Sequence, residues 1–172
     1  MRKLLVDITP LRESPPYRRL WTGMALSAIG APLTLVAMSL QVYALTQSTF
    51  AVGMIGVFSL VPLIVAGLYG GSIVDAHDRR KIAILASIVL WAVTIGVAAQ
   101  AWLQLDQTWL LYVFAAIQSA AMGINQAARS AIIPRLVRPE LLSASNALSM
   151  IVFGAGMSIG PLLAGFLVAS VG

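Results

Sequence analysis

The sequence predicts an all-α integral membrane protein with five transmembrane helices, and three observations lead to this fold class. The 172 residues are 59% hydrophobic and only 10% charged, with a mean hydropathy of +0.91, whereas a soluble domain is typically about 45–50% apolar and about 25% charged. The apolar residues gather in five long runs, and nearly all basic residues fall between the runs. Because a water-soluble core could not bury this much apolar surface, we expect the lipid bilayer to surround the chain.

The five runs have the length of membrane-spanning helices. An α-helix rises about 1.5 Å per residue, so about 20 apolar residues cross the hydrocarbon core. We expect helices at about 20–45, 50–74, 82–103, 109–133 and 141–171, after a cytoplasmic leader at 1–19. The first run is too long for the apolar core of a cleaved signal peptide, so we expect it to be a retained helix.

The leader leaves two structures open. Residues 4–16 carry mixed charges and include Pro15 and Pro16. This composition is compatible both with a short helix in the membrane interface and with a loosely ordered tail.

The orientation in the membrane follows from the basic residues. Outside the apolar runs they occur in the leader and in two of the four links: Arg2, Lys3, Arg12, Arg18, Arg19, Arg79, Arg80, Lys81, Arg135 and Arg138. Arg129 lies just inside the end of the fourth run. The other two links, at 46–49 and 104–107, contain no basic residue. Because loops rich in Lys and Arg stay in the cytoplasm, we expect a multi-pass protein of the cell inner membrane with a cytoplasmic amino terminus.

Composition also excludes several classes of function. A net charge of +5 would suit a nucleic-acid binder only with basic residues on an exposed face; since they occur in short stretches between apolar runs, we expect no nucleic-acid partner. The chain has no Cys, which excludes thiolate chemistry, and its single His, His77, has no partner at metal-ligand spacing. The sequence contains no nucleophile–base pair or phosphate loop, so we expect no enzyme, no metal and no cofactor.

The link after the second run combines small, acidic and basic residues. From Gly71 to Lys81 it reads Gly-Ser-Ile-Val-Asp-Ala-His-Asp-Arg-Arg-Lys. Asp75 is followed four and five residues later by Arg79 and Arg80, so these charges can neutralise one another or clamp a neighbouring helix. The preceding glycines allow another backbone to approach closely. These residues alone leave open a gate element and a solvated loop that only sets the topology.

This link resembles the signature loop of major facilitator superfamily transporters, Gly-x-x-x-Asp-Arg-x-Gly-Arg-Arg/Lys. Ala76 and Asp78 replace its first Arg and its second Gly. Four positions match the pattern: Gly71, Asp75, Arg79 and Arg80. The resemblance implies that the loop latches the cytoplasmic gate and that its Asp contacts a helix of the carboxyl-terminal half of the transporter.

The last run contains a second motif, which reads Gly-x-x-x-Gly-Pro-x-x-Ala-Gly. Its small residues form a groove for close helix packing, and its proline removes a backbone donor and bends the helix. The motif is similar to the antiporter motif of the superfamily, with Ala164 in place of one glycine, and this similarity implies an exporter. An ordinary packing face of small residues has the same physical features. The matching positions are Gly156, Gly160, Pro161 and Gly165.

Shorter matches extend the resemblance over nearly the whole chain. They are similar to one efflux branch, which contains the enterobactin exporter and related bacterial proteins. They comprise Arg18-Arg19-Leu20-Trp21, Thr46-x-Ser48 with Val52-Gly53, Ala128-Arg129 at the cytoplasmic end of the fourth run, Pro134-Arg135-Leu136-Val137 and Asn146-Ala147-Leu148. Ser119 stands where many proton-coupled members have an Arg, so that residue is not available here for proton coupling.

The resemblance also implies a six-helix half built from two inverted three-helix repeats. This chain supplies three helices and then two, so residues 20–172 form a partial transporter domain. We expect the missing carboxyl-terminal half to be its partner, and we expect the fragment to be unable to transport alone. It would then be either a truncated gene product or part of a longer protein.

The implied function is export of a small organic molecule, such as a siderophore or a drug, by alternating access. The alternatives are a non-transporting membrane protein that assembles with a partner, a truncated gene remnant, and a half-transporter that associates with itself. In such folds the substrate lies near the bilayer midplane, but no run has an ionisable residue away from its ends. We therefore expect apolar and hydrogen-bonding contacts, with five polar candidates that equally suit bonds between helices: Gln41, Gln118, Asn125, Gln126 and Asn146.

Overall fold

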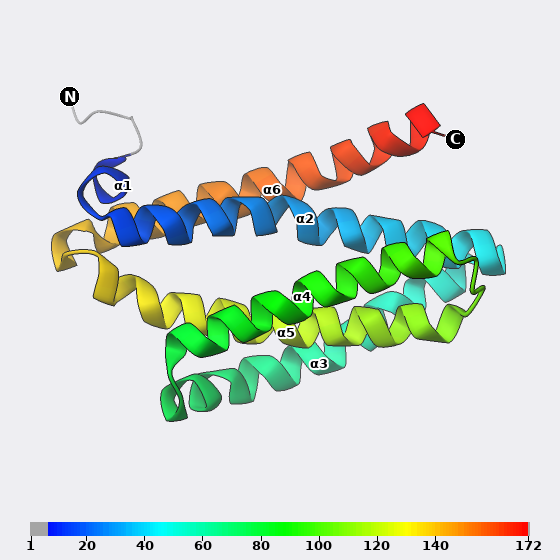
Figure 1. Cartoon of the computed structure of the whole chain (residues 1–172), viewed down its shortest axis with the longest axis horizontal. Coiled ribbons are helices and arrows are strands. Elements are labelled where there is room, and N and C mark those ends of the chain that lie inside the picture. The colour runs from blue at the N-terminus through cyan, green and yellow to red at the C-terminus, as the bar shows by residue number, and fades with distance from the viewer. Residues whose placement is uncertain (1–6, 172) are drawn as a thin grey trace. The chain divides into compact units, whose positions relative to one another are not determined.

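A computed structural model describes residues 7–171, with side chains to Phe166, and every described element is a helix (Figure 1). In chain order these are α1 (Thr9–Glu13), α2 (Pro15–Thr46), α3 (Thr49–Ala76), α4 (Arg79–Trp102), α5 (Thr108–Leu136), the 3₁₀ turn η1 (Pro139–Leu141) and α6 (Leu142–Val171). Within the described residues, five helices are long and apolar enough to cross a membrane. The predicted all-α membrane fold is thus confirmed.

Four of the five long helices begin before the apolar runs that predicted them. We expected the first to begin at Leu20, but α2 begins at Pro15, so the leader 1–19 is not a single unit. Pro15 and Pro16 are tolerated because the first residues of a helix have no acceptor for their N–H groups. The expected limits of 50–74 and 109–133 likewise fall short of α3 and α5, whereas the expected 82–103 begins three residues after the start of α4 and ends one residue beyond it. The expected 141–171 begins one residue before α6. The shortfall arises because charged side chains near a membrane surface can remain helical and reach toward the headgroups.

Two short links connect antiparallel helices. Gln47 and Ser48 alone join α2 to α3; Gln47 has a positive φ of 49°, and the Ser48 hydroxyl accepts the amide of Ala51 at 3.3 Å. Between α4 and α5 the turn uses positive φ angles at Gln104 and Asp106. These are the two links without a basic residue.

The chain forms two compact units, which are described separately. The α6 unit comprises the described residues up to Leu33 and from Ile132 onward, and the α3–α4 unit comprises Thr34–Ala131. The helices α2 and α5 contribute residues to both.

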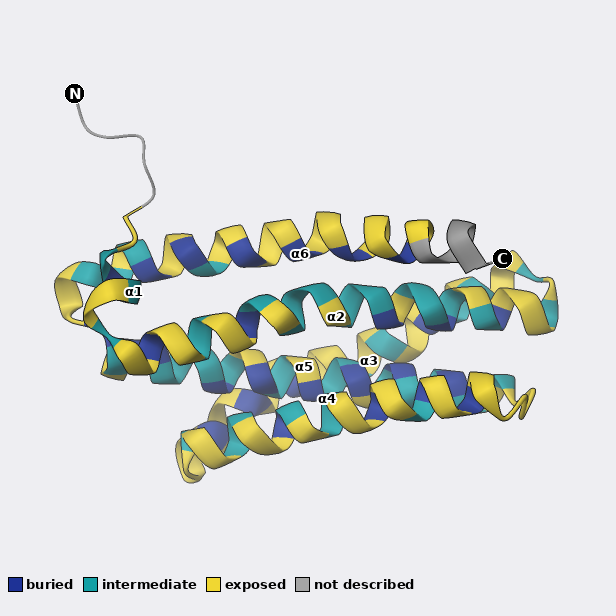
Figure 2. Ribbon diagram, turned by 45° about the horizontal axis from the view of Figure 1, so that its top comes forward, coloured by how far each residue is buried: buried dark blue, intermediate teal, exposed yellow. Residues whose placement is uncertain are grey.

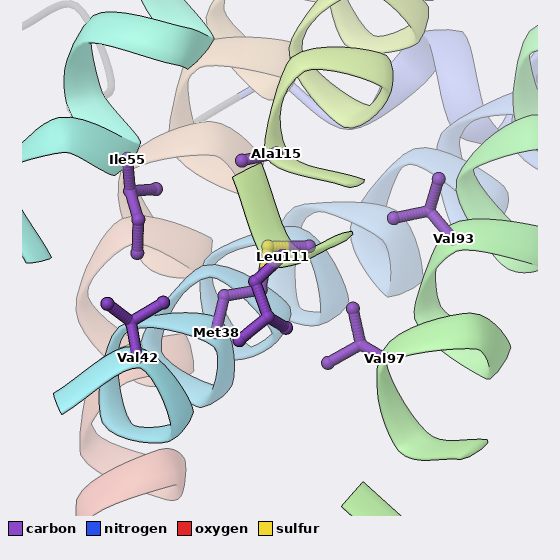
Figure 3. Close-up of a cluster of buried hydrophobic side chains, with 7 residues drawn as sticks. All are labelled: Met38, Val42, Ile55, Val93, Val97, Leu111 and Ala115. Carbon is purple, nitrogen blue, oxygen red and sulfur yellow. The ribbon is translucent and has the colours of Figure 1, made fainter. Parts of the chain in front are cut away.

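The core of the α3–α4 unit is a cluster of buried apolar side chains from four helices (Figure 3). Glycines permit close contacts in this unit: a Cβ atom on Gly96 would lie 2.8 Å from the ring of Phe114, which packs against the cluster, and one on Gly123 would lie 2.8 Å from the Cβ of Ala66. The cluster consists of Met38, Val42, Ile55, Val93, Val97, Leu111 and Ala115.

The core of the α6 unit lies where α1, the start of α2, the end of α5 and the start of α6 meet. Tyr17 is fully buried there with Ile133, Val137 and Leu148, and Leu11 of α1 packs against them. Much of the outer surface of the helices is exposed in both units (Figure 2). Large apolar side chains such as Trp91 (72% exposed) lie on this surface, as expected for faces that contact lipid.

Candidate functional site

The signature loop falls on two helix ends that are tied together by Arg79. The Nη2 atom of Arg79, at the start of α4, lies 3.0 Å from the Oδ1 atom of Asp75 near the end of α3. Its Nη1 atom donates to the backbone carbonyl of Ala131 on α5 at 3.1 Å. The Arg79 side chain is 29% exposed and that of Asp75 is 69% exposed. Arg79 is therefore the anchored member of the pair, and it joins three helices within the α3–α4 unit.

Asp78, which departs from the family pattern, has a local structural role. Its carboxylate accepts the backbone amides of Arg80 at 2.9 Å and Lys81 at 3.4 Å, so it caps α4. An N-cap residue satisfies amides that have no acceptor inside the helix. We missed this role in the sequence, although an Asp immediately before a helical run is the signal that predicts it.

The glycines of this region divide between two faces of α3. A Cβ atom on Gly70 would contact Ala127 of α5 at 3.6 Å, whereas Cβ atoms on Gly67 and Gly71 would meet nothing within 4 Å. Gly70 therefore supports packing inside the unit, and Gly71 of the signature loop lies on an open face. Arg80 is exposed, and Arg129 on α5 is half-buried.

Two of the five polar residues considered for substrate binding connect helices. Asn125 on α5 is 4% exposed and donates to two acceptors on α4, the carbonyl of Ala83 at 3.2 Å and the Ser87 hydroxyl at 2.9 Å. Gln41 on α2 donates to the carbonyl of Val97 on α4 at 3.4 Å. Gln118 is buried, whereas Gln126 and Asn146 are exposed. Four of these residues belong to the α3–α4 unit and Asn146 to the α6 unit.

In the α6 unit, α2 and α6 run side by side in the same direction (Figure 1). The hydroxyl of Tyr17 donates to the carbonyl of Ser145 at 3.0 Å, and the indole of Trp21 donates to the carbonyl of Leu148 at 3.4 Å. Further along, Gly156 meets Ala28. These residue numbers differ by 127 or 128, so the register stays constant over several turns. We define these contacts, with that of Gly160 below, as the α2–α6 seam.

Two glycines of the antiporter-like motif lie in this seam. A Cβ atom on Gly156 would lie 2.6 Å from the carbonyl carbon of Ala28, and one on Gly160 would lie 2.9 Å from the Cβ of Pro32. Pro32 has no N–H, so it cannot donate to the Ala28 carbonyl as a residue four positions later normally does. The Cα–H groups of Gly156 can take the place of that donor as weak hydrogen-bond partners. Gly156 on α6 therefore lies against the carbonyl that loses its usual donor because of Pro32 on α2.

The other two positions of the motif lie elsewhere. Pro161 is exposed, α6 continues as one helix through it, and a Cβ atom on Gly165 would meet nothing within 4 Å. The motif therefore divides into Gly156 and Gly160, which pack on α2, and Pro161 and Gly165, which do not.

Near the amino terminus, α1 contacts the rest of the α6 unit through an ion pair as well as through apolar packing. Glu13 lies 2.7 Å from the guanidinium of Arg138, which precedes η1. The pKa of Asp7 is lowered because the hydroxyl and the backbone amide of Thr9 donate to its carboxylate. Among the described residues there is no group of three or more His, Cys, Asp or Glu side chains that could hold a metal ion.

Comparison with known proteins gives one family match and a set of relatives. The family model described as transmembrane secretion effector matches residues 6–172. The enterobactin exporter EntS of Salmonella typhimurium (strain LT2) is 26% identical over 168 residues, which are 98% of this chain and 41% of that protein. The protein of the same name from Escherichia coli O1:K1 is 26% identical over 98% of this chain and 40% of its own length. The chain thus spans about two fifths of these relatives. No solved structure matches the chain.

The seam predicts unequal effects of substitution at two neighbouring glycines. Gly156→Ala places a methyl group against the backbone of Ala28, so we expect it to lower the free energy of unfolding by about 1–3 kcal/mol. Gly154→Ala is the matched control because its added methyl group meets nothing within 4 Å. Unfolding in mild detergent, followed by circular dichroism, measures both. Equal stability of the two variants would contradict the close contact.

The link between α5 and α4 predicts a second pair of unequal effects. Asn125→Ala removes both hydrogen bonds to α4, and hydrogen bonds between membrane helices contribute about 0.6–1.7 kcal/mol. The same unfolding measurement should show a loss in this range, whereas Gln126→Ala, at an exposed neighbouring position, should leave stability unchanged. A larger loss for Gln126→Ala than for Asn125→Ala would show that the interaction is assigned to the wrong residue.

Proposed function

The chain belongs to the transmembrane secretion effector family of the major facilitator superfamily, and we propose that it forms the amino-terminal part of an exporter. This exporter moves a small organic molecule outward across the membrane by alternating access. The proposal rests on the family match, which runs from residue 6 to residue 172 and includes all five membrane helices. Alternating access needs two halves that rock around a shared site, so we assign to this chain one wall of that site.

The signature loop supports a gating role for the turn between α3 and α4. Arg79 makes an ion pair with Asp75 and a hydrogen bond to α5, so a force on Asp75 would reach three helices. The carboxylate of Asp75 remains largely exposed and can accept a second partner. We assign this partner to the carboxyl-terminal half of the transporter.

The names of the relatives and the residue types within the apolar runs support a class of substrate. The named relatives are enterobactin exporters, and enterobactin is a siderophore. In this chain, the central parts of the five apolar runs contain no ionisable residue, so the substrate would be bound through apolar and hydrogen-bonding groups rather than a buried ion pair. A siderophore or an amphiphilic drug fits this description.

Export by the product of the complete gene tests the proposal. In cells that lack their own siderophore exporter, we expect this product to release a siderophore or an amphiphilic drug faster than an empty vector does. Mass spectrometry of medium and cells measures the release. Residues 1–172 expressed alone should not release it, because alternating access needs two halves and these residues span about two fifths of the exporters that they match. Failure of the complete product with every compound would overturn the exporter assignment.

Substitution of two acidic residues of the same loop distinguishes a specific role in gating from the general effect of losing a negative charge. Asp75→Asn removes the partner of Arg79, and a change of about 1.4 kcal/mol between gate states corresponds to about tenfold in an equilibrium. We therefore expect export to fall about tenfold. Asp78→Asn removes the same charge but keeps a side chain that caps a helix well, so export should stay within about twofold. Equal loss in both variants would contradict a specific role of Asp75.

The orientation is tested with single cysteines, since the chain has none of its own. We place the amino terminus in the cytoplasm because the basic links lie on one side. A maleimide that cannot cross membranes should label Gln107→Cys in intact cells and His77→Cys only after permeabilisation. Both positions are exposed, so accessibility within the fold does not bias the result. The reverse pattern would invert the topology.

A further inference from the structure

Four arginine side chains lie exposed at the end of the α6 unit that contains α1. Arg12 belongs to α1, Arg18 and Arg19 to the first turns of α2, and Arg135 to the last turn of α5. We call them the arginine surface. A fifth arginine at this end, Arg138, is paired with Glu13.

Among residues 7–166, whose side chains the structure describes, the guanidinium groups of the arginine surface have no protein partner. None of them takes part in an ion pair or a side-chain hydrogen bond there. The acidic groups of this end do not balance them, because Glu13 is used by Arg138 and Asp7 is bonded to Thr9. Glu140 is the remaining described carboxylate in these segments. The end therefore presents an excess of positive charge.

The backbone next to the arginine surface is held in place by packed side chains. Three of its arginines are close in sequence to members of the apolar cluster of Tyr17, Ile133, Val137 and Leu148, and Tyr17 is fully buried with its hydroxyl bonded to α6. Arg18 and Arg19 follow Tyr17 in the chain, so their backbone is held by this contact. A ligand that bound them would not first have to order the backbone, which lowers the cost of binding.

The chemistry of the arginine surface suits phosphate at the depth of the lipid headgroups. The surface contains arginine and no lysine, and guanidinium groups bind phosphate oxygens through two parallel hydrogen bonds. The apolar run of α2 begins at Leu20, immediately after Arg19. The arginines therefore lie next to the hydrocarbon boundary, and the side chain of Leu26, 75% exposed one to two turns further along α2, provides a surface for an acyl chain.

We propose that the arginine surface is a binding site for the headgroup of an anionic phospholipid. Arg18 and Arg19, at the first turns of α2, can donate to the phosphate diester, and Arg12 and Arg135 contribute positive charge from α1 and α5. The site would anchor the α1 end of the unit to an anionic leaflet. It does not depend on the proposed export, since it requires only the membrane.

The test titrates the purified chain in neutral detergent with phosphatidylglycerol and with zwitterionic phosphatidylcholine. Native mass spectrometry counts the bound lipids and gives apparent affinities. A basic residue near an anionic membrane surface contributes about 1 kcal/mol, or about fivefold. We therefore expect Arg18→Gln with Arg19→Gln to weaken phosphatidylglycerol binding by about 25-fold. The matched control is Arg80→Gln with Lys81→Gln, which removes the same charge from the link before α4 and should change binding less than twofold.

A second variant and a competitor complete the test. Arg135→Gln lies on a different helix and should weaken binding about fivefold, so the proposal stays testable if the double variant does not fold by circular dichroism. Equal losses in the control pair, or equal binding of phosphatidylcholine, would overturn the site. Displacement of the lipid by millimolar inorganic phosphate would assign the surface to a free anion and overturn the lipid proposal.

Discussion

Where α6 passes α2, the backbone of Gly156 lies against the carbonyl of Ala28, and no side chain fits between them. In a membrane the apolar faces of two helices gain little by leaving lipid, so their association depends on close packing and on polar bonds. The α2–α6 seam uses both, since Tyr17 and Trp21 bond to carbonyls of α6 at one end and glycines admit the backbone further along. Because Pro32 has no N–H, it cannot donate to the carbonyl of Ala28, and Gly156 lies against that carbonyl.

The α3–α4 unit solves the same problem with different residues. Its apolar cluster joins four helices, and isolated polar side chains add bonds between particular pairs of them. Asn125 binds α4 twice, and Tyr112 donates to the carbonyl of Ala51 on α3 at 2.9 Å. Because a polar group in hydrocarbon is costly when unpaired, such bonds fix which helices are neighbours. They also explain why Asn125, a candidate for substrate contact by residue type, is occupied within the protein.

The signature loop shows how a departure from a family pattern can preserve local structure. Asp78 replaces a glycine and caps α4, so the turn after α3 still ends in a well-formed helix. Arg79 then extends across the turn to both Asp75 and the backbone of Ala131. The pattern match identified the charged pair, but the role of α5 as its third member depends on how the helices pack.

The sequence by itself determined the class of fold, the five helices and the positions of the links. The reason is that the bilayer requires about 20 apolar residues for each crossing and tolerates few charges within a crossing. It did not determine helix ends such as Pro15, where capping rather than hydropathy decides. Only the tertiary structure decided which motif residues act: Gly156 and Gly160 pack on α2, whereas Gly165 stays open. The reason is that small residues permit contact on any face of a helix, and the facing backbone selects which of them is used.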